Sequence, residues 1–119
     1  MMECLRLWAL FWEWAWYLEE HGHRVESEEN DPTIVRSQNG RGTRYRWLLL
    51  WAEKPARRLR ALERRRVRTE LETGKKGREH VYVVVAFERP TNRLLIVPAA
   101  RALRLPVLSS DKGGIPWEW

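Results

Sequence analysis

The sequence has little cysteine, few amide side chains and no long apolar run. Its single cysteine, Cys4, excludes a disulfide framework and a zinc site built on cysteines. The longest apolar stretch, near residues 4–18, is interrupted by Arg6 and Glu13 and is shorter than the roughly 20 residues of a membrane span. No basic segment precedes it and no small-residue cleavage site follows, so it does not resemble a signal peptide. These absences predict a soluble, cytoplasmic protein without a membrane partner.

Asparagine and glutamine are scarce, and arginine far outnumbers lysine. Few thermolabile amides are typical of a thermophile, although an arginine bias also arises from genome composition. The 119 residues include 44% hydrophobic and 32% charged side chains, enough apolar material for a core. We therefore expect one domain over residues 1–119, with a core over about 4–104 and a C-terminal extension over 105–119.

The net charge of +6 is distributed unevenly along the chain. Residues 1–31 contain eight acidic and two basic side chains, whereas the remaining residues contain 20 basic and eight acidic ones. A basic body attracts polyanions, because phosphates bind Arg and Lys and release counterions on contact. We therefore expect a nucleic-acid partner, with the acidic N-terminal block facing away from it or holding cations.

Residues 4–20 have the pattern of a helix that is apolar on almost all sides. At 100° per residue, Arg6, Glu13 and Glu20 fall on one narrow polar stripe, and four tryptophans lie elsewhere on the circumference. Such a helix is buried on several sides. One sheet face in a small domain cannot cover all of these rings, so we expect a second copy of the chain to do so, in a homodimer. Gly22 ends the helix.

Strand patterns follow this helix. A short segment around Val25 leads to a strand over 33–36, and the Asn39-Gly40 turn predicts a hairpin into the next strand. That strand, over 44–51, is apolar on both faces from Trp47 onward, which is typical of an inner strand.

A second helix is expected from Pro55 to about Thr73, closed by Gly74. Its predicted inner face comprises Leu59, Leu62, Val67 and Leu71. The opposite side gathers Lys54 and five arginines, which form either a solvated surface or one that contacts phosphates. The residues expected to bind nucleic acid are Arg57, Arg58, Arg64, Arg65, Arg68, Lys75, Lys76, Arg78, Arg41 and Arg44.

The C-terminal part contains the strongest strand pattern, over 81–88, which is apolar on both faces and predicted to be central. A turn over 89–92 leads to a strand over 93–97, which Pro98 ends, and a short helix is expected over 99–104. The resulting order, α-β-β-β-α-β-β, predicts an α/β layered domain with a mixed sheet flanked by helices.

In this order the chain resembles the PD-(D/E)XK nuclease superfamily, which includes Holliday-junction resolvases and restriction-endonuclease-like folds. The segment Tyr17–Val25 is similar to the family's first helix ending in a glycine before the first strand, and 81–87 with 91–98 is similar to its later strand pair. The resemblance covers roughly residues 8–100. It implies a metal-dependent endonuclease acting on structured or double-stranded nucleic acid, with DNA favoured over RNA.

In that family an Asp on the second strand, and a Glu or Gln two residues before a Lys on the third, hold a divalent metal beside the scissile phosphate. The resemblance implies Asp31 as the first acid and Lys54 as the lysine, with Mg²⁺ or Mn²⁺ as the cofactor. Ala52 stands two residues before the lysine, however, and Glu53 is adjacent to it. A metal site would need a bulge at Glu53, or a carboxylate from Glu13 or Glu20 of the first helix.

Each of these residues also has a structural interpretation. Asp31 precedes a proline, where aspartate favours turns, and Glu53 with Lys54 can cap the following helix. Two alternatives to the nuclease therefore stand: a catalytically inactive module with the same fold, which binds nucleic acid or serves assembly, and a subunit whose Trp-rich helix docks on a larger protein.

Overall fold

A five-stranded mixed sheet lies at the centre of the computed structural model, which describes residues 2–26, 31–88 and 93–109. The strands follow the spatial order β1-β2-β3-β5-β6. Strands β3 and β5 run parallel to each other, and the remaining neighbours are antiparallel. The bounds are β1 Arg24–Glu26, β2 Ile34–Gln38, β3 Arg44–Ala52, β5 Glu79–Phe87 and β6 Arg93–Pro98.

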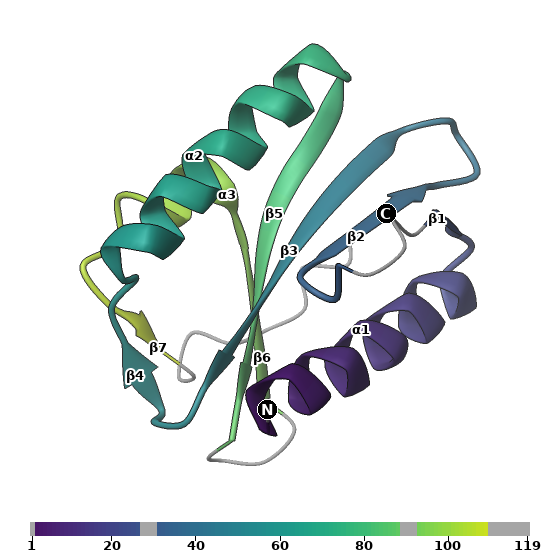
Figure 1. The fold of residues 1–119 in the computed structure, drawn as a ribbon. Helices are drawn as coiled ribbons and strands as arrows, with labels where there is room; N and C mark the ends of the chain where they lie inside the picture. Colours follow the sequence, from purple (N-terminus) through teal and green to yellow (C-terminus); the bar gives the residue numbers. More distant parts are fainter. Residues whose placement is uncertain (1, 27–30, 89–92, 110–119) are drawn as a thin grey trace.

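Helices cover both faces of this sheet (Figure 1). Helix α1, Met2–Glu20, packs on one face, whereas α2, Ala61–Lys76, and the short α3, Ala99–Ala102, pack on the other. The expected layered α/β architecture, with its restriction-endonuclease-like element order, is confirmed.

The two central strands bury side chains on both faces, which explains their continuous apolar runs. Trp47 and Leu49 of β3 point into the core beneath α1, whereas Leu48 points into the core beneath α2. The same alternation places Val84 of β5 in the α1 core and Val83 in the α2 core. A parallel pair between β3 and β5 requires a crossover, and α2 supplies it.

The predicted hairpin between β2 and β3 is present. The side-chain oxygen of Asn39 accepts hydrogen bonds from the backbone N–H groups of Arg41, at 3.0 Å, and Thr43, at 2.9 Å. Gly42 takes the left-handed conformation there, with φ +84°. This turn fixes the register of the hairpin, in which Gln38 opposes Arg44.

The prediction for the start of the second helix is wrong. Helix α2 begins at Ala61 and not at Pro55, because 56–57 form a short strand, β4 (Ala56–Arg57), that pairs with β7 (Leu108–Ser109). The Glu63 carboxylate then accepts the backbone N–H of Arg60 at 2.8 Å and caps the first turn.

Two further details of α2 differ from expectation. Gly74 does not close the helix, which continues to Lys76, and it instead packs against β5 at Val81. Leu62, expected on the inner face, is 73% exposed, whereas Val67 is fully buried as expected. The predicted turn over 89–92 and the extension beyond residue 109 lie outside the described residues.

Helix α1 has one side against the sheet and one side facing outward. Leu10, Phe11, Trp14 and Leu18 are buried on the sheet. On the far side, Leu5 is 70% exposed, and Trp12 and Trp16 are each 64% exposed. Within the described chain, the sheet therefore leaves an apolar side of α1 uncovered, as the composition of the helix implied.

Candidate nucleic-acid interface

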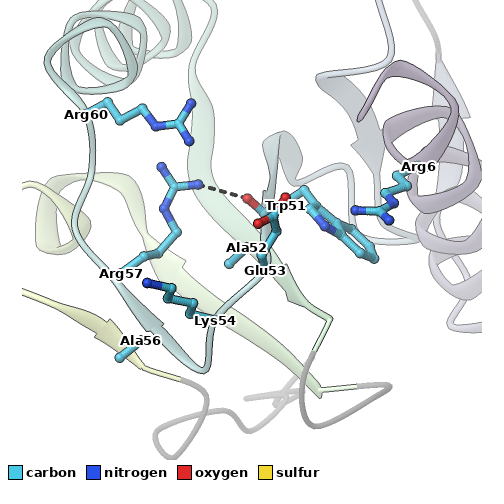
Figure 2. Close-up of a pocket in the computed structure, with 8 residues that line it drawn as sticks. All are labelled: Arg6, Trp51, Ala52, Glu53, Lys54, Ala56, Arg57 and Arg60. Carbon is cyan, nitrogen blue, oxygen red and sulfur yellow. Dashed lines mark hydrogen bonds between the residues drawn. The ribbon is translucent and has the colours of Figure 1, made fainter. Parts of the chain in front are cut away.

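A cavity of about 480 Å³ lies beyond the end of β3 (Figure 2). The strand ends at Ala52, and the bend residues Glu53 and Lys54 both line the cavity. Side chains alternate between the two faces only within a strand, so adjacent residues beyond its end can share one space. The structure therefore brings Glu53 and Lys54 to one site without a residue inserted into β3.

Four cationic side chains from different parts of the chain converge on this cavity. They are Arg6 of α1, Lys54 of the bend, Arg57 of β4 and Arg60, which precedes α2. Within the part of the chain that the structure describes, neither Lys54 nor Arg60 has an ion-pair partner. Two cations are thus available to an anion such as a phosphate group.

The other two cations are held in place by neighbours. Arg6 pairs with Glu88 at 3.4 Å, and its guanidinium carbon lies 5.3 Å from the centre of the Trp51 ring. Arg57 donates to the backbone oxygen of Trp51 at 2.8 Å and also pairs with the Glu63 carboxylate. These contacts fix the walls of the cavity and neutralise part of its charge.

Asp31, the acid that the resemblance implies, is bound to protein groups. Its carboxylate accepts the backbone N–H of Thr33 at 3.0 Å and the Thr33 hydroxyl, and it pairs with Arg66 at 3.0 Å. Partial burial raises the pKa of Asp31, but the hydrogen bonds from Thr33 and the charge of Arg66 outweigh this effect and lower the pKa below its ordinary value. The carboxylate is therefore ionised and held by α2.

The other acids are separated from Asp31. Glu13 and Glu20 are exposed on α1, which packs on the sheet face opposite α2. Across residues 2–26, 31–88 and 93–109, no three His, Cys, Asp or Glu side chains form a group that could hold a metal ion. Ala52, which stands where the resemblance expects the second metal-binding acid, packs with Leu50 in the core beneath α2 and offers no carboxylate. These residues do not fit the Mg²⁺ or Mn²⁺ centre that the resemblance implies.

A buried ion network, which sequence reasoning missed, extends from Asp31 through α2 into the sheet. Arg66 pairs with Glu70 at 3.1 Å, Glu70 with Arg46 at 2.8 Å, and Arg46 with Glu79 at 3.2 Å. Arg36 on β2 also pairs with Glu79, at 3.0 Å. The side chains of Arg46, Glu70 and Glu79 are at most 10% exposed. The signal for it was Arg46, a charge at a core-facing position of a buried strand.

The basic residues expected to bind nucleic acid form two groups. In the first group, Arg58 is exposed next to the cavity-lining Arg57, and Arg65 and Arg68 are exposed on α2. Arg57 lies on β4 rather than on the helix and is mostly buried, and Arg64 donates to the backbone oxygen of Leu103 at 2.9 Å.

The second group lies at the C-terminal end of α2. Lys75, Lys76 and Arg78 are exposed there, as is Arg41 at the tip of the β2–β3 hairpin. Arg44 joins the two segments, since it donates to the backbone oxygen of Gly77 at 3.4 Å. At 1.5 Å per residue, Arg68 and Lys75 are about 10 Å apart along the axis of α2, so the two groups follow each other along the helix.

The element order and the layers are those expected of a restriction-endonuclease-like fold. The chain is similar in structure to Hjc, a Holliday junction resolvase from the hyperthermophilic archaeon Archaeoglobus fulgidus, with a TM-score of 0.58 and 17% sequence identity. The match covers 74% of this chain and 68% of that one. No protein-family model and no curated protein matches the sequence. The predicted resemblance is confirmed for the fold.

None of the helices in the described chain is long and apolar enough to cross a membrane.

Proposed function

We propose that this protein binds the phosphate backbone of nucleic acid, with DNA favoured over RNA, at the cavity beyond β3. The observation that carries the proposal is the convergence of Arg6, Lys54, Arg57 and Arg60 on one cavity of a nuclease-type fold. Lys54 and Arg60 are available for charge-assisted hydrogen bonds to phosphate oxygens. The resemblance to a DNA-processing fold supports DNA as the polyanion.

The surface beyond the cavity extends this contact. Arg65 and Arg68 are exposed one turn apart on α2, and Arg58 is exposed just before it. Contacts from such side chains go to phosphates and position a duplex without reading its sequence. Binding at this surface is therefore independent of sequence and strongly dependent on salt.

The experiment is a fluorescence anisotropy titration of a labelled DNA duplex at several salt concentrations. Lys54→Ala and Arg60→Ala each weaken binding and lower the slope of log affinity against log salt by about one. Arg24→Ala is the matched control, because Arg24 is an exposed arginine on the edge strand β1. Equal losses from all three variants would show diffuse attraction instead of a site.

Phosphodiester hydrolysis is the second candidate function. One observation favours it: Glu53 and Lys54, an acid and a lysine, line the same cavity. The described acids do not form a metal centre beside them, so binding and not cleavage is our conclusion. In this proposal the protein is an inactive nuclease-fold module.

We also propose that the protein is a homodimer through α1. Leu5, Ala9, Trp12 and Trp16 are exposed and repeat at i, i+4, i+7 and i+11, which forms one stripe on the side away from the sheet. The last turn of α1 has no basic residue and carries Glu19 and Glu20, which oppose its own dipole. In an antiparallel pair, the positive N-terminal end of the second copy's α1 lies beside these carboxylates. This complementarity selects a second copy as the occupant of the stripe.

A further inference from the structure

A second, apolar cavity of about 230 Å³ adjoins the basic one. It lies between the two long helices, where Leu7 of α1 and Leu62 of α2 face the end of β3 at Leu50 and Trp51. Leu62 is 73% exposed, so its side chain is accessible at the rim of the cavity. Most of the side chains that line the cavity are thus apolar, and so is Leu62 at its rim.

The two cavities share Trp51 as a common wall. Consecutive residues line them as well, since Arg6 faces the basic cavity and Leu7 the apolar one. The Arg57–Glu63 ion pair also joins them, with Arg57 in the first and Glu63 in the second. The Nε1–H of Trp51 is buried and has no hydrogen-bond partner among the described residues.

The polar side chains of the apolar cavity are already engaged within the protein. Arg66 binds Asp31 and Glu70, and the Thr33 hydroxyl lies within hydrogen-bond distance of both Arg66 and Asp31. Glu63 holds Arg57 and caps α2. A ligand in this cavity therefore meets apolar and aromatic surface, with few groups that could read its polar edges.

We propose that the two cavities together accept one unpaired nucleotide, with the base in the apolar cavity and its phosphate in the basic cavity. This inference rests on the proposed function and adds a substrate class to it: nucleic acid with an unpaired base, in preference to a continuous duplex. A stacked duplex offers its phosphates but hides its bases, so it fills only the basic cavity. Because the apolar lining reads no base edges, every base is accepted.

The positive charge around the two cavities favours a nucleotide over an apolar peptide as the ligand. Four cationic side chains line the basic cavity. The exposed Arg58 and Arg65 are near the lining residues Arg57 and Arg60 in the sequence. An apolar peptide leaves Lys54 and Arg60 without a partner, whereas a nucleotide supplies both an apolar face and a phosphate.

The experiment compares a continuous duplex with the same duplex carrying one unpaired 2-aminopurine, by anisotropy and by the emission of that base. We expect the wild-type protein to favour the unpaired substrate about tenfold, since stacking of one base on aromatic surface has an effect of this order. The emission should change on binding. Leu62→Ser should abolish the preference while leaving duplex affinity unchanged, and its fold should persist because the side chain is exposed. Thr69→Ala changes an exposed position of α2 that lines neither cavity and should retain the preference.

The experiment distinguishes failure of the proposed function from failure of this inference. A protein that binds neither substrate contradicts the proposed function itself. A protein that binds both substrates equally, or whose Leu62→Ser variant keeps the preference, overturns this inference and leaves the proposed function standing. Displacement of the unpaired substrate by an uncharged apolar peptide, with no effect of that peptide on duplex binding, would also overturn it, because the apolar cavity would then be a peptide site.

Discussion

Arg66 on α2 holds Asp31, which lies ahead of β2, with a distance of 3.0 Å between Nη2 and Oδ2. The same guanidinium pairs with Glu70 one turn further along α2. The acid that the resemblance assigns to a metal thus has an internal cation as its partner. Asp31 consequently ties the entry of β2 to α2 and belongs to the network that ends at Glu79.

The ionised state of Asp31 stabilises the fold in a defined pH window. Its pKa in the folded protein is lowered, so the unfolded chain takes up the proton first as pH falls. The stabilisation is present above the ordinary aspartate pKa and is lost as pH falls through the lowered value. We expect Asp31→Asn to reduce the free energy of unfolding by about 1 kcal/mol at neutral pH.

This difference is measured by urea denaturation of both proteins at several pH values. It should shrink toward acidic pH, where Asp31 becomes protonated in the wild-type protein. A difference that stays constant down to the most acidic pH at which both variants fold would show that the ionic form of Asp31 does not contribute.

Breaking the buried part of the network should lower the free energy of unfolding more than Asp31→Asn does. Arg46 lies between Glu70 and Glu79, with side-chain exposures of 7%, 10% and 3% respectively. Arg46→Ala leaves two buried carboxylates without their shared cation, so we expect a loss of about 3 kcal/mol in the free energy of unfolding. Arg68→Ala, at an exposed position of α2, should change stability by less than about 0.5 kcal/mol. Similar effects of the two variants in denaturant melts would contradict the role of the network.

Strand order could be predicted from the sequence because the central strands carry an unambiguous pattern. The runs around Trp47 and Val84 are apolar on both faces, and only inner strands bury both faces. The start of α2 could not be predicted, since Pro55 suits a helix start and only the pairing of Ala56 with Ser109 shows that the chain is extended there. That contact joins residues far apart in sequence, which local propensity does not reveal.

The candidate site was predictable only in part, for a similar reason. The sequence pointed to Lys54, and the structure places it with Arg60 in a cavity. The sequence did not reveal Arg6 as a member of this cavity, because α1 approaches the end of β3 only in the folded chain. Arg66 was not recognised as the partner of Asp31, since 35 residues separate them.

The close approach of α2 to β5 depends on Gly74. A Cβ placed there would lie 2.2 Å from Cγ2 of Val81 and 3.3 Å from the backbone oxygen of Glu79. Val81 is β-branched and cannot swing aside, so Gly74→Ala should destabilise the fold by about 1–3 kcal/mol despite the better helix propensity of alanine. Adding Val81→Ala should recover part of this loss in a double-mutant cycle. A stabilised Gly74→Ala variant would show that the helix can move away from the strand.

Cleavage assays decide between the two candidate functions. With Mg²⁺ or Mn²⁺ and branched or linear DNA, we expect no hydrolysis, because Asp31 is held by Arg66 and the described acids do not converge beside Lys54. Any cleavage should be tested with Asp31→Ala and Lys54→Ala. Cleavage lost in both variants would establish the nuclease, whereas cleavage retained in both would point to other residues or to a contaminant.

The α1 stripe predicts the oligomeric state. Trp12 and Trp16 are each 64% exposed, so Trp12→Ser with Trp16→Ser removes most of the stripe without opening the core. We expect sedimentation velocity to give a dimer for the wild-type protein and a monomer for this double variant. Leu62→Ser, which removes an exposed apolar side chain on the other sheet face, should stay dimeric.

The charge at the end of α1 tests the orientation of the two helices. In an antiparallel pair, Glu19 and Glu20 face the partner's helix N-terminus, so replacing both with lysine should weaken the dimer. A dimer strengthened by that change would contradict the antiparallel arrangement.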